Sequence, residues 1–237
     1  MWRVLDGRER ELLEATSDWL LRHKHWEAAQ GFALVDEITV TIAAQAALLV
    51  LGLSVDEYRE VSAIIVYPTA VLSRGVYAGP VMGTVTDGVL PVLGEAHGRR
   101  GPVLLAWDEA EAAARNPGRG HNVVLHEFAH KLDMLDDILD GTPRFERRGD
   151  LDRWVEVCTE AYSDLRAGVE RPPLQPYGAT NPAEFFAVAT EAFFDVPVAL
   201  EHNEPSLYEV MRDFYKQDPA TRIGRDALGT SMEVDDL

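Results

Sequence analysis

The chain has 237 residues, of which 46% are hydrophobic and 26% are charged, so it can bury a core of its own. This composition excludes a disulfide-dependent peptide scaffold and a disordered chain. Its 22 basic and 40 acidic residues give a formal net charge of −18 at pH 7, a field that repels phosphate backbones and anionic lipid, so we expect no direct contact with nucleic acid or membrane surfaces.

Helical spacing dominates the front quarter of the chain. Apolar residues recur at helical spacing in residues 8–30, and residues 38–53 form a second, more apolar helical stretch. The charged start lacks the apolar core of a signal peptide. The longest apolar run, 42–55, contains Gln45 and is shorter than the ~20 residues that a membrane span needs. We therefore expect a cytoplasmic protein.

The residue pattern changes between Ser62 and Trp107, where short apolar and β-branched runs are broken by Gly and Pro. These runs predict strands at Ile64–Tyr67, Val81–Thr86, Val89–Gly94 and Val103–Trp107. We expect them to form a small antiparallel or mixed sheet. The last run is either an edge to which an extended peptide could add as a β-strand or an interior core strand.

Helical patterns then return, at residues 108–115, 122–139, 150–168, 182–195 and 204–216. A Pro-rich connection at 171–176 separates the third from the fourth. The only cysteine, Cys158, excludes an internal disulfide and a cysteine-ligated cluster, and its helical setting favours a buried apolar role over a nucleophile. The predicted class is α+β, with one domain over residues 1–223 and an acidic tail, 224–237, that we expect to fray.

The segment 121–133 contains the pattern His126-Glu127-x-x-His130. On a helix the two imidazoles lie one turn apart on one face, so both can reach one tetrahedral metal while Glu127 points beside them. Apolar residues of the same segment fall on a different face, which can be buried in the core. The pattern therefore predicts a zinc site facing a cleft, the alternative being a chance occurrence in a helical protein.

A catalytic zinc site needs a third protein ligand and an open fourth position. No further histidine follows at the short spacing of the three-histidine metalloproteases, so we expect a carboxylate on a later helix. The candidates are Glu156, Glu160, Glu184 and Glu191. Asp133, three residues after His130, could accept the second ring N–H of a ligating imidazole and fix its tautomer, or could be a solvated helix residue.

Glu184 lies at the start of a predicted helix, with Asn181 as a natural N-cap and Pro182 at the first helical position. The pattern Asn181-x-x-Glu184 also resembles a capping box, in which Glu184 would only bond the Asn181 amide. Spacing alone leaves both roles open. Glu191, two turns further along the same face, is the reserve candidate, either as a carboxylate behind a ligand or as the third ligand itself.

The segments 126–133 and 177–187 resemble the zinc-peptidase family of Mlc titration factor A and, more distantly, the catalytic domain of anthrax lethal factor. Both motifs occur in order, and the resemblance runs from about residue 10 to 220. It implies a gluzincin-like fold, one zinc ion per chain and aminopeptidase-type activity on small peptides. In enteric bacteria it also implies capture of the Mlc repressor that controls glucose uptake.

The resemblance implies roles for individual residues as well. His126, His130 and Glu184 match the family's zinc ligands, Glu127 its catalytic base, and Tyr177 a tyrosine that assists the reaction. We therefore expect a zinc metallopeptidase acting on a peptide or protein substrate, in which Glu127 takes a proton from the attacking water. Tyr177 would donate to the developing oxyanion, unless it only packs its loop.

A second hypothesis is a regulatory protein that sequesters a transcriptional repressor of the Mlc type by protein–protein contact. The net charge of −18 suits contact with a basic protein surface. The two hypotheses are compatible, and mutants of the zinc site separate them, because a pure binder would keep its partner after losing hydrolysis.

Overall fold

The computed structural model describes residues 4–69 and 100–224 and, between them, the backbone of four two-residue strands. Helices make up most of these parts of the chain and one small sheet accompanies them, so the predicted α+β class is confirmed. The α-helices are α1 (Gly7–His23), α2 (Asp36–Leu49), α3 (Trp107–Arg115), α4 (Val123–Asp133), α5 (Arg148–Arg166), α6 (Pro182–Asp195), α7 (Pro197–Asn203) and α8 (Pro205–Tyr215).

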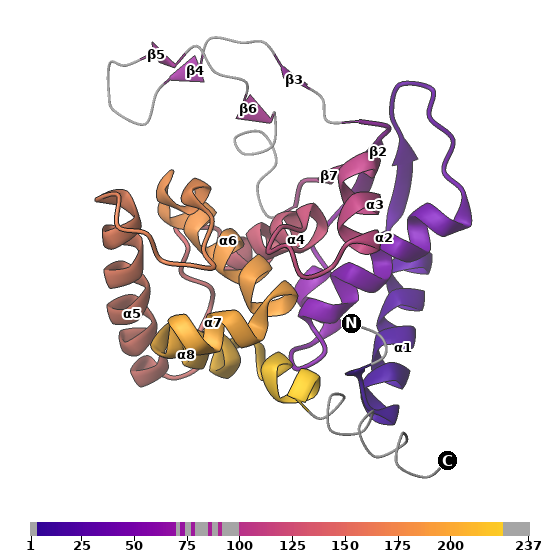
Figure 1. The fold of residues 1–237 in the computed structure, drawn as a ribbon. Helices are drawn as coiled ribbons and strands as arrows, with labels where there is room; N and C mark the ends of the chain where they lie inside the picture. Colours follow the sequence, from indigo (N-terminus) through magenta and orange to yellow (C-terminus); the bar gives the residue numbers. More distant parts are fainter. Residues whose placement is uncertain are drawn as a thin grey trace, which may run out of the picture.

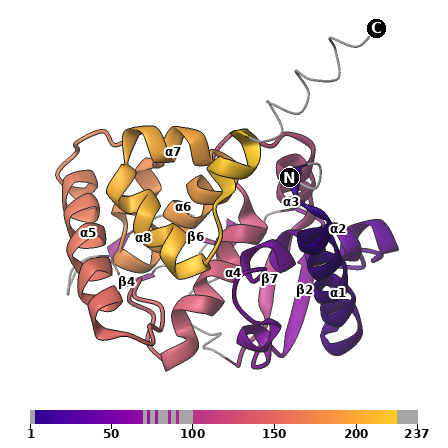
Figure 2. The ribbon, with the colours of Figure 1, turned by 90° about the horizontal axis from the view of Figure 1, so that it is seen from below.

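Helix α4 lies in the middle of the molecule. The sheet, α1 and α2 are on one side of it, and α5, α7 and α8 are on the other (Figures 1 and 2). Helix α6 packs along α4, and α2 contacts α4 from the opposite side. The His126-Glu127-x-x-His130 segment therefore lies where the two halves of the fold meet.

The strands of the main sheet are, in spatial order, β1 (His25–Ala28), β2 (Ala63–Tyr67) and β7 (Val103–Ala106). Both pairings are parallel, and Ile64 is in register with Trp26 on one side and with Val103 on the other. The expected antiparallel or mixed pairing is therefore wrong for this sheet. Parallel neighbours need a long crossover, which α2 supplies between β1 and β2. Among the described strands β7 pairs only with β2, so it is an edge strand.

Strand β1 lies inside the stretch 8–30, for which a helix was predicted. Helix α1 ends at His23, and the next residue, Lys24, is extended with φ −103° and ψ 146°. The Lys24 ammonium donates to three backbone carbonyls at the end of the 3₁₀ turn η2 (Val55–Tyr58), those of Tyr58, Arg59 and Val61. Spacing along the chain does not reveal this long-range contact, which ends the helix next to the sheet.

Two further ladders are antiparallel and consist of two-residue strands. They pair β3 (Leu72–Ser73) with β6 (Leu90–Pro91) and β4 (Tyr77–Ala78) with β5 (Val85–Thr86). The predicted strands Val81–Thr86 and Val89–Gly94 overlap β5 and β6, and their remaining residues lie outside the described part of the chain. The predicted tail 224–237 lies outside it as well, apart from its first residue.

Other predicted helices differ in extent as well: the stretch 38–53 forms α2, which ends at Leu49, and two later stretches differ more clearly. The stretch 122–139 ends as an α-helix at Asp133 and continues as a 3₁₀ turn, η3 (Met134–Asp136), which stops where Asp137 adopts a left-handed φ of 68°. The stretch 204–216 forms α8, but a separate helix, α7, precedes it and was not predicted. Pro197 and Pro205 each occupy the first position of these helices, where the missing amide hydrogen is tolerated.

The core of the C-terminal half surrounds α6. All three of its phenylalanines from Phe186 onward are buried, and they contact Tyr215, which is fully buried as well. Burying one such side chain stabilises the fold by roughly 1.5–3 kcal/mol. Cys158 is buried too, which raises the pKa of its thiol, so a packing role is confirmed for it. No helix in the described ranges combines the length and the apolarity that a membrane span requires.

Candidate metal centre

Helix α4 begins at a residue that connects three helices. The side chain of Asn122 caps α4, because its Oδ1 accepts from the amides of Val124 and Leu125 at 3.1 and 3.2 Å. Its Nδ2 donates to Gln45 Oε1 on α2 at 2.7 Å, and its backbone amide donates to Glu191 Oε2 on α6. The start of α4 is therefore fixed relative to both neighbouring helices.

One turn into α4, His126 and His130 face the same side, with ring centroids 4.9 Å apart. Glu184, in the first turn of α6, places its Oε2 at 2.9 Å from His126 Nε2 and 3.6 Å from His130 Nε2. The ligand atoms of the three residues all lie within 4.8 Å of one another. Two elements that are far apart in the sequence thus bring two imidazoles and one carboxylate together.

This donor set fits a zinc ion. Bonds of ~2.0–2.1 Å at a tetrahedral angle require ligand atoms about 3.3 Å apart, and the 2.9 and 3.6 Å separations to Glu184 lie on either side of that value. Two histidines and one glutamate also form one of the ligand sets of catalytic zinc sites, which keep a fourth position open. His126, His130 and Glu184 are therefore the residues that would hold a metal.

Only one of the two hydrogen bonds of a capping box is present between Asn181 and Glu184. Asn181 Oδ1 accepts from the Glu184 backbone amide at 2.9 Å, as an N-cap does. The Glu184 carboxylate is engaged with His126 instead of returning to the Asn181 amide. Asn181 thus fixes the backbone of Glu184, which leaves its side chain for the imidazoles.

Behind His126 lies the carboxylate of Glu191, only 2% exposed. Its Oε1 lies 2.6 Å from His126 Nδ1. Its Oε2 accepts from the amide of Asn122 and lies 2.9 Å from Nδ1 of His121, whose side chain is 64% exposed. The carboxylate therefore orients the second nitrogen of a candidate ligand, as partners behind metal-binding histidines do, and also holds the loop before α4.

One turn further along α6, Asp195 continues this row of carboxylates. Its two oxygens accept from the backbone amides of Gly118 and Gly120 at 2.8 and 2.6 Å. Both glycines have a positive φ, 87° and 69°, a backbone conformation that residues other than glycine rarely adopt. Glu184, Glu191 and Asp195, spaced two turns and then one turn apart, thus connect α6 to the segment 118–130.

The surroundings of His130 are different. Its Nδ1 is buried and has no hydrogen-bond partner among the residues that the structure describes, and neither has Oδ1 of Asp133. The other Asp133 oxygen accepts from the Gly141 amide at 2.9 Å. Burial raises the pKa of Asp133 to about 6. The hydrogen bond expected from the sequence, between Asp133 and a ligating imidazole, is therefore not among the contacts of the described residues.

Gly141 itself links this corner to the start of α6. Its φ is +76°, and a Cβ there would overlap the carbonyl oxygen of Pro182, two residues before Glu184. Its own carbonyl accepts from Trp154 Nε1 at 3.1 Å. Close backbone approach at this position therefore determines where the helix carrying Glu184 begins.

Glu127 and Tyr177 border the same site. Burial raises the pKa of Glu127, and the charges of both histidines oppose that shift. The ring of Tyr177, in the 3₁₀ turn η4 (Pro176–Ala179), lies 6.1 Å from the His126 ring and is 43% exposed. Burial and the charges of Glu184 and Glu127 raise the pKa of Tyr177 to about 12.

In the ligand set, hydrogen bonds and neighbouring charges together outweigh the effect of burial on the pKa values. Burial lowers the pKa of His126, but the hydrogen bonds with Glu184 and Glu191 outweigh burial and raise it to about 10. Burial raises the pKa of Glu184, whereas its hydrogen bonds with both histidines lower it to about 2. The carboxylates of Glu184 and Glu191 thus stabilise a positive charge on the His126 ring between them.

The other two carboxylate candidates lie elsewhere. Glu156 is exposed on α5, and Glu160 lines a separate cavity described below. Sequence reasoning did not identify Gln45, His121, Asn122 and Asp195 as parts of the site. Only Asn122 has a local signal, since an asparagine directly before an apolar helical run is a typical N-cap.

Known proteins resemble the chain over most of its length. The model of a family described as glucose-regulated metallo-peptidase M90 matches residues 1–216. An uncharacterized protein of Synechocystis is 38% identical over 218 residues, 91% of this chain and 79% of that protein. Mlc titration factor A of Serratia proteamaculans is 31% identical over 236 residues, 97% and 88% of the two chains. Mlc titration factor A of Pectobacterium atrosepticum is 30% identical over 225 residues, 92% and 83%.

Proposed function

The chain belongs to the glucose-regulated metallo-peptidase M90 family, and from this premise we propose that it hydrolyses peptide bonds with one zinc ion held by His126, His130 and Glu184. The observation that carries the proposal is the convergence of these three side chains beside Glu127, a buried carboxylate that is not one of the three. A structural zinc site has four protein ligands and needs no such neighbour.

The chemistry follows from the positions of these groups. A zinc ion bound there would act as a Lewis acid on the scissile carbonyl and lower the pKa of a water to ~7. Glu127 accepts a proton from the attacking water at a carboxylate oxygen and returns it to the leaving amine. Glu191 keeps the His126 ring in one orientation throughout.

The test combines metal analysis with peptide turnover. We expect about one zinc per chain in the purified protein, loss of turnover after chelation and recovery after zinc is added back. Glu127→Gln should keep the zinc and lower kcat by at least ~10²-fold, because general acid–base catalysis contributes about that much. Turnover that survives chelation, or wild-type turnover in Glu127→Gln, would remove the proposal.

For Tyr177 we propose hydrogen-bond donation to the oxyanion. Such a donor acts mainly in the transition state, and removing one costs about 10²–10³-fold in kcat. Tyr177→Phe should therefore keep zinc content and KM near those of the wild type while kcat falls by that factor. A tyrosine that only packs its loop would leave kcat within a few-fold of the wild type.

We propose aminopeptidase-type activity on small peptides, with the substrate adding as a strand to the edge of β7. A blocked N-terminus distinguishes this from endopeptidase activity. Peptides with a free amine should be cleaved and their acetylated counterparts should not. Equal cleavage of both would make the protein an endopeptidase and leave the zinc chemistry intact.

A second candidate function is the sequestration of a transcriptional repressor of the Mlc type in the cytoplasm. It is supported by the names of two relatives, Mlc titration factor A, and by the net charge of −18, which suits a basic protein surface. Binding of purified Mlc by the wild type and by His126→Ala tests it. Equal binding by both proteins would separate this function from the metal site, and no binding by either would remove it.

A further inference from the structure

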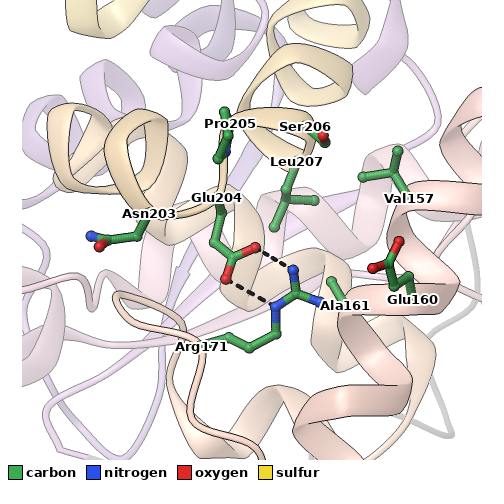
Figure 3. A pocket seen from close by; sticks show the side chains of 9 residues that line it. All are labelled: Val157, Glu160, Ala161, Arg171, Asn203, Glu204, Pro205, Ser206 and Leu207. Atoms are coloured by element: carbon green, nitrogen blue, oxygen red, sulfur yellow. Dashed lines mark hydrogen bonds and ion pairs between the residues drawn. The ribbon is translucent and has the colours of Figure 1, made fainter.

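The segment that presents Tyr177 is fixed by a polar contact at a cavity between α5 and the junction of α7 and α8. We call residues 167–181 the α5–α6 connection. Within it, Arg171 lines a cavity of about 130 Å³ together with residues of α5 and of the junction between α7 and α8 (Figure 3). None of the metal-site residues lines this cavity.

Arg171 makes three charged hydrogen bonds to two other elements. Its Nε and Nη2 donate to the two oxygens of Glu204 at 2.9 and 2.6 Å, a bidentate pair that Figure 3 shows. Its Nη1 donates to Asp164 Oδ2 on α5 at 3.0 Å. The fixed fork of the guanidinium matches a carboxylate in this way, whereas a lysine ammonium would not.

Burial strengthens this pair. The Glu204 side chain is 8% exposed and that of Arg171 is 19% exposed, so water screens their attraction less than at the surface. The hydrogen bonds with Glu204 raise the pKa of Arg171 further above its already high value. Arg171 therefore ties the α5–α6 connection to the residue before α8.

The other end of the connection is held by packing. A Cβ at Gly178 would already contact Val188 of α6 and Leu165 of α5 at 3.4 and 3.6 Å. Between the two ends, Leu174 is buried, and its amide donates to the Arg171 carbonyl at 2.9 Å. Tyr177 follows directly before Gly178, so its backbone lies between one polar and one packed attachment.

We propose that Arg171 is a positioning residue, which acts through the α5–α6 connection to hold the Tyr177 hydroxyl over the metal centre. The inference rests on the proposed function, since it assigns a role to a residue of the same reaction. Without the fork to Glu204 and Asp164, the connection would lose its charged attachment and keep only backbone bonds to α5 and the packing of Leu174 and Gly178. Because catalysis depends on positions at the level of about 1 Å, such loosening reaches kcat although Arg171 does not touch the substrate.

A double-mutant cycle tests this role. Arg171→Met should lower kcat by about ten-fold or more with unchanged zinc content, and Arg171→Lys, which keeps the charge and loses the fork, should lower it less. In a Tyr177→Phe background the same changes should alter kcat by less than about two-fold, because no hydroxyl is left to misplace. Arg222→Met is the matched control, since it breaks the buried pair with Glu9 far along the chain from Tyr177.

A readout without activity accompanies the cycle. In hydrogen exchange, Arg171→Met should speed exchange of the amides of Leu174, Gly178 and Thr180, which are bonded within the connection, and should leave α4 unchanged. Asp164→Asn, at a partner that is 45% exposed, should do the same more weakly and serves if Arg171→Met does not fold.

Three results would overturn the inference: unchanged kcat, an equal fall in kcat in both backgrounds, or unchanged exchange in the connection. If the wild type hydrolyses no peptide, the proposed function is removed. The exchange experiment still tests whether Arg171 holds the α5–α6 connection. We expect faster exchange in the connection of Arg171→Met and unchanged kcat and exchange in Arg222→Met. We also expect a non-additive effect on kcat when Arg171→Met is combined with Tyr177→Phe.

Discussion

His126 and His130 lie one turn apart on α4 with nearly equal exposure, 12% and 13%, but their outer nitrogens have different partners. His126 Nδ1 lies against Glu191, which is itself held by Asn122 and His121. His130 Nδ1 has no partner within the described ranges. The Nδ1 side of one imidazole is thus fixed by a hydrogen bond before any metal arrives, and that of the other only by packing.

The difference has its origin in how α6 lies along α4. Glu184, Glu191 and Asp195 contact segment 118–130 on the side of His126, whereas Asp133, three residues after His130, turns one oxygen toward Gly141. A helix that supplies a ligand from its first turn can therefore orient only one of the two histidines from its later turns.

The largest effect is expected where the two histidines share a partner. Glu184 contacts both, so Glu184→Gln should lower zinc affinity by more than the ~10–100-fold that a residue behind the ligands costs. Competition with a chromogenic chelator measures it. If Glu184 is only a capping residue, zinc will stay bound and the free energy of unfolding will fall by a few tenths to about 1 kcal/mol.

Next comes the carboxylate that orients His126. Glu191→Gln leaves one acceptor oxygen for three donor groups, so zinc affinity should fall by about 10–100-fold while the zinc stoichiometry at saturation stays at one. The same titration measures it. Affinity within two-fold of the wild type would mean that hydrogen bonding does not distinguish the two histidines in the loaded protein.

Asp133→Asn makes the matching change on the side of His130. The amide oxygen can still accept from Gly141, and no hydrogen bond to His130 is lost, so we expect zinc affinity to change by less than about ten-fold. A loss as large as that of Glu191→Gln would show that the carboxylate accepts from His130 once the metal is bound, as the sequence suggested.

The smallest effect concerns the start of α4. Asn122→Ala removes the cap and the bond to Gln45, and should lower the free energy of unfolding by about 1 kcal/mol with a small loss of zinc affinity. Asp6→Ala, which removes the cap of the distant helix α1, is the control and should leave zinc affinity unchanged. Chemical denaturation of both variants, with and without zinc, makes the comparison.

Local patterns predicted the helix carrying His126 and His130, because period, cap and apolar face all lie within a dozen neighbouring residues. The parallel direction of β2 and β7 could not be predicted in this way, because a short apolar run contains no information about the direction of its partner. Strand β1 was not predicted for a similar reason, since the hydrogen bonds from Lys24 to the turn at Tyr58 span more than thirty residues.

In the site, too, local patterns could be predicted from the sequence and long-range contacts could not. Glu191 had two open roles in the sequence, and the structure places it behind His126. Asp195 has the sequence signature of an ordinary acid at the end of a helix, and its contacts with Gly118 and Gly120 connect residues 77 and 75 positions apart. Contacts of this kind follow from helix packing, which a single sequence does not encode in any short pattern.

Gly141 limits what a protein engineer could transplant. Grafting α4 and α6 alone onto another scaffold would copy the two imidazoles and the carboxylate but not the bare backbone that lets the first turn of α6 come so close to Gly141. A host loop with any side chain at that position would push Glu184 away from its two partners. The minimal portable unit therefore includes residues 133–141, nine positions that contribute no ligand and set the spacing of all three.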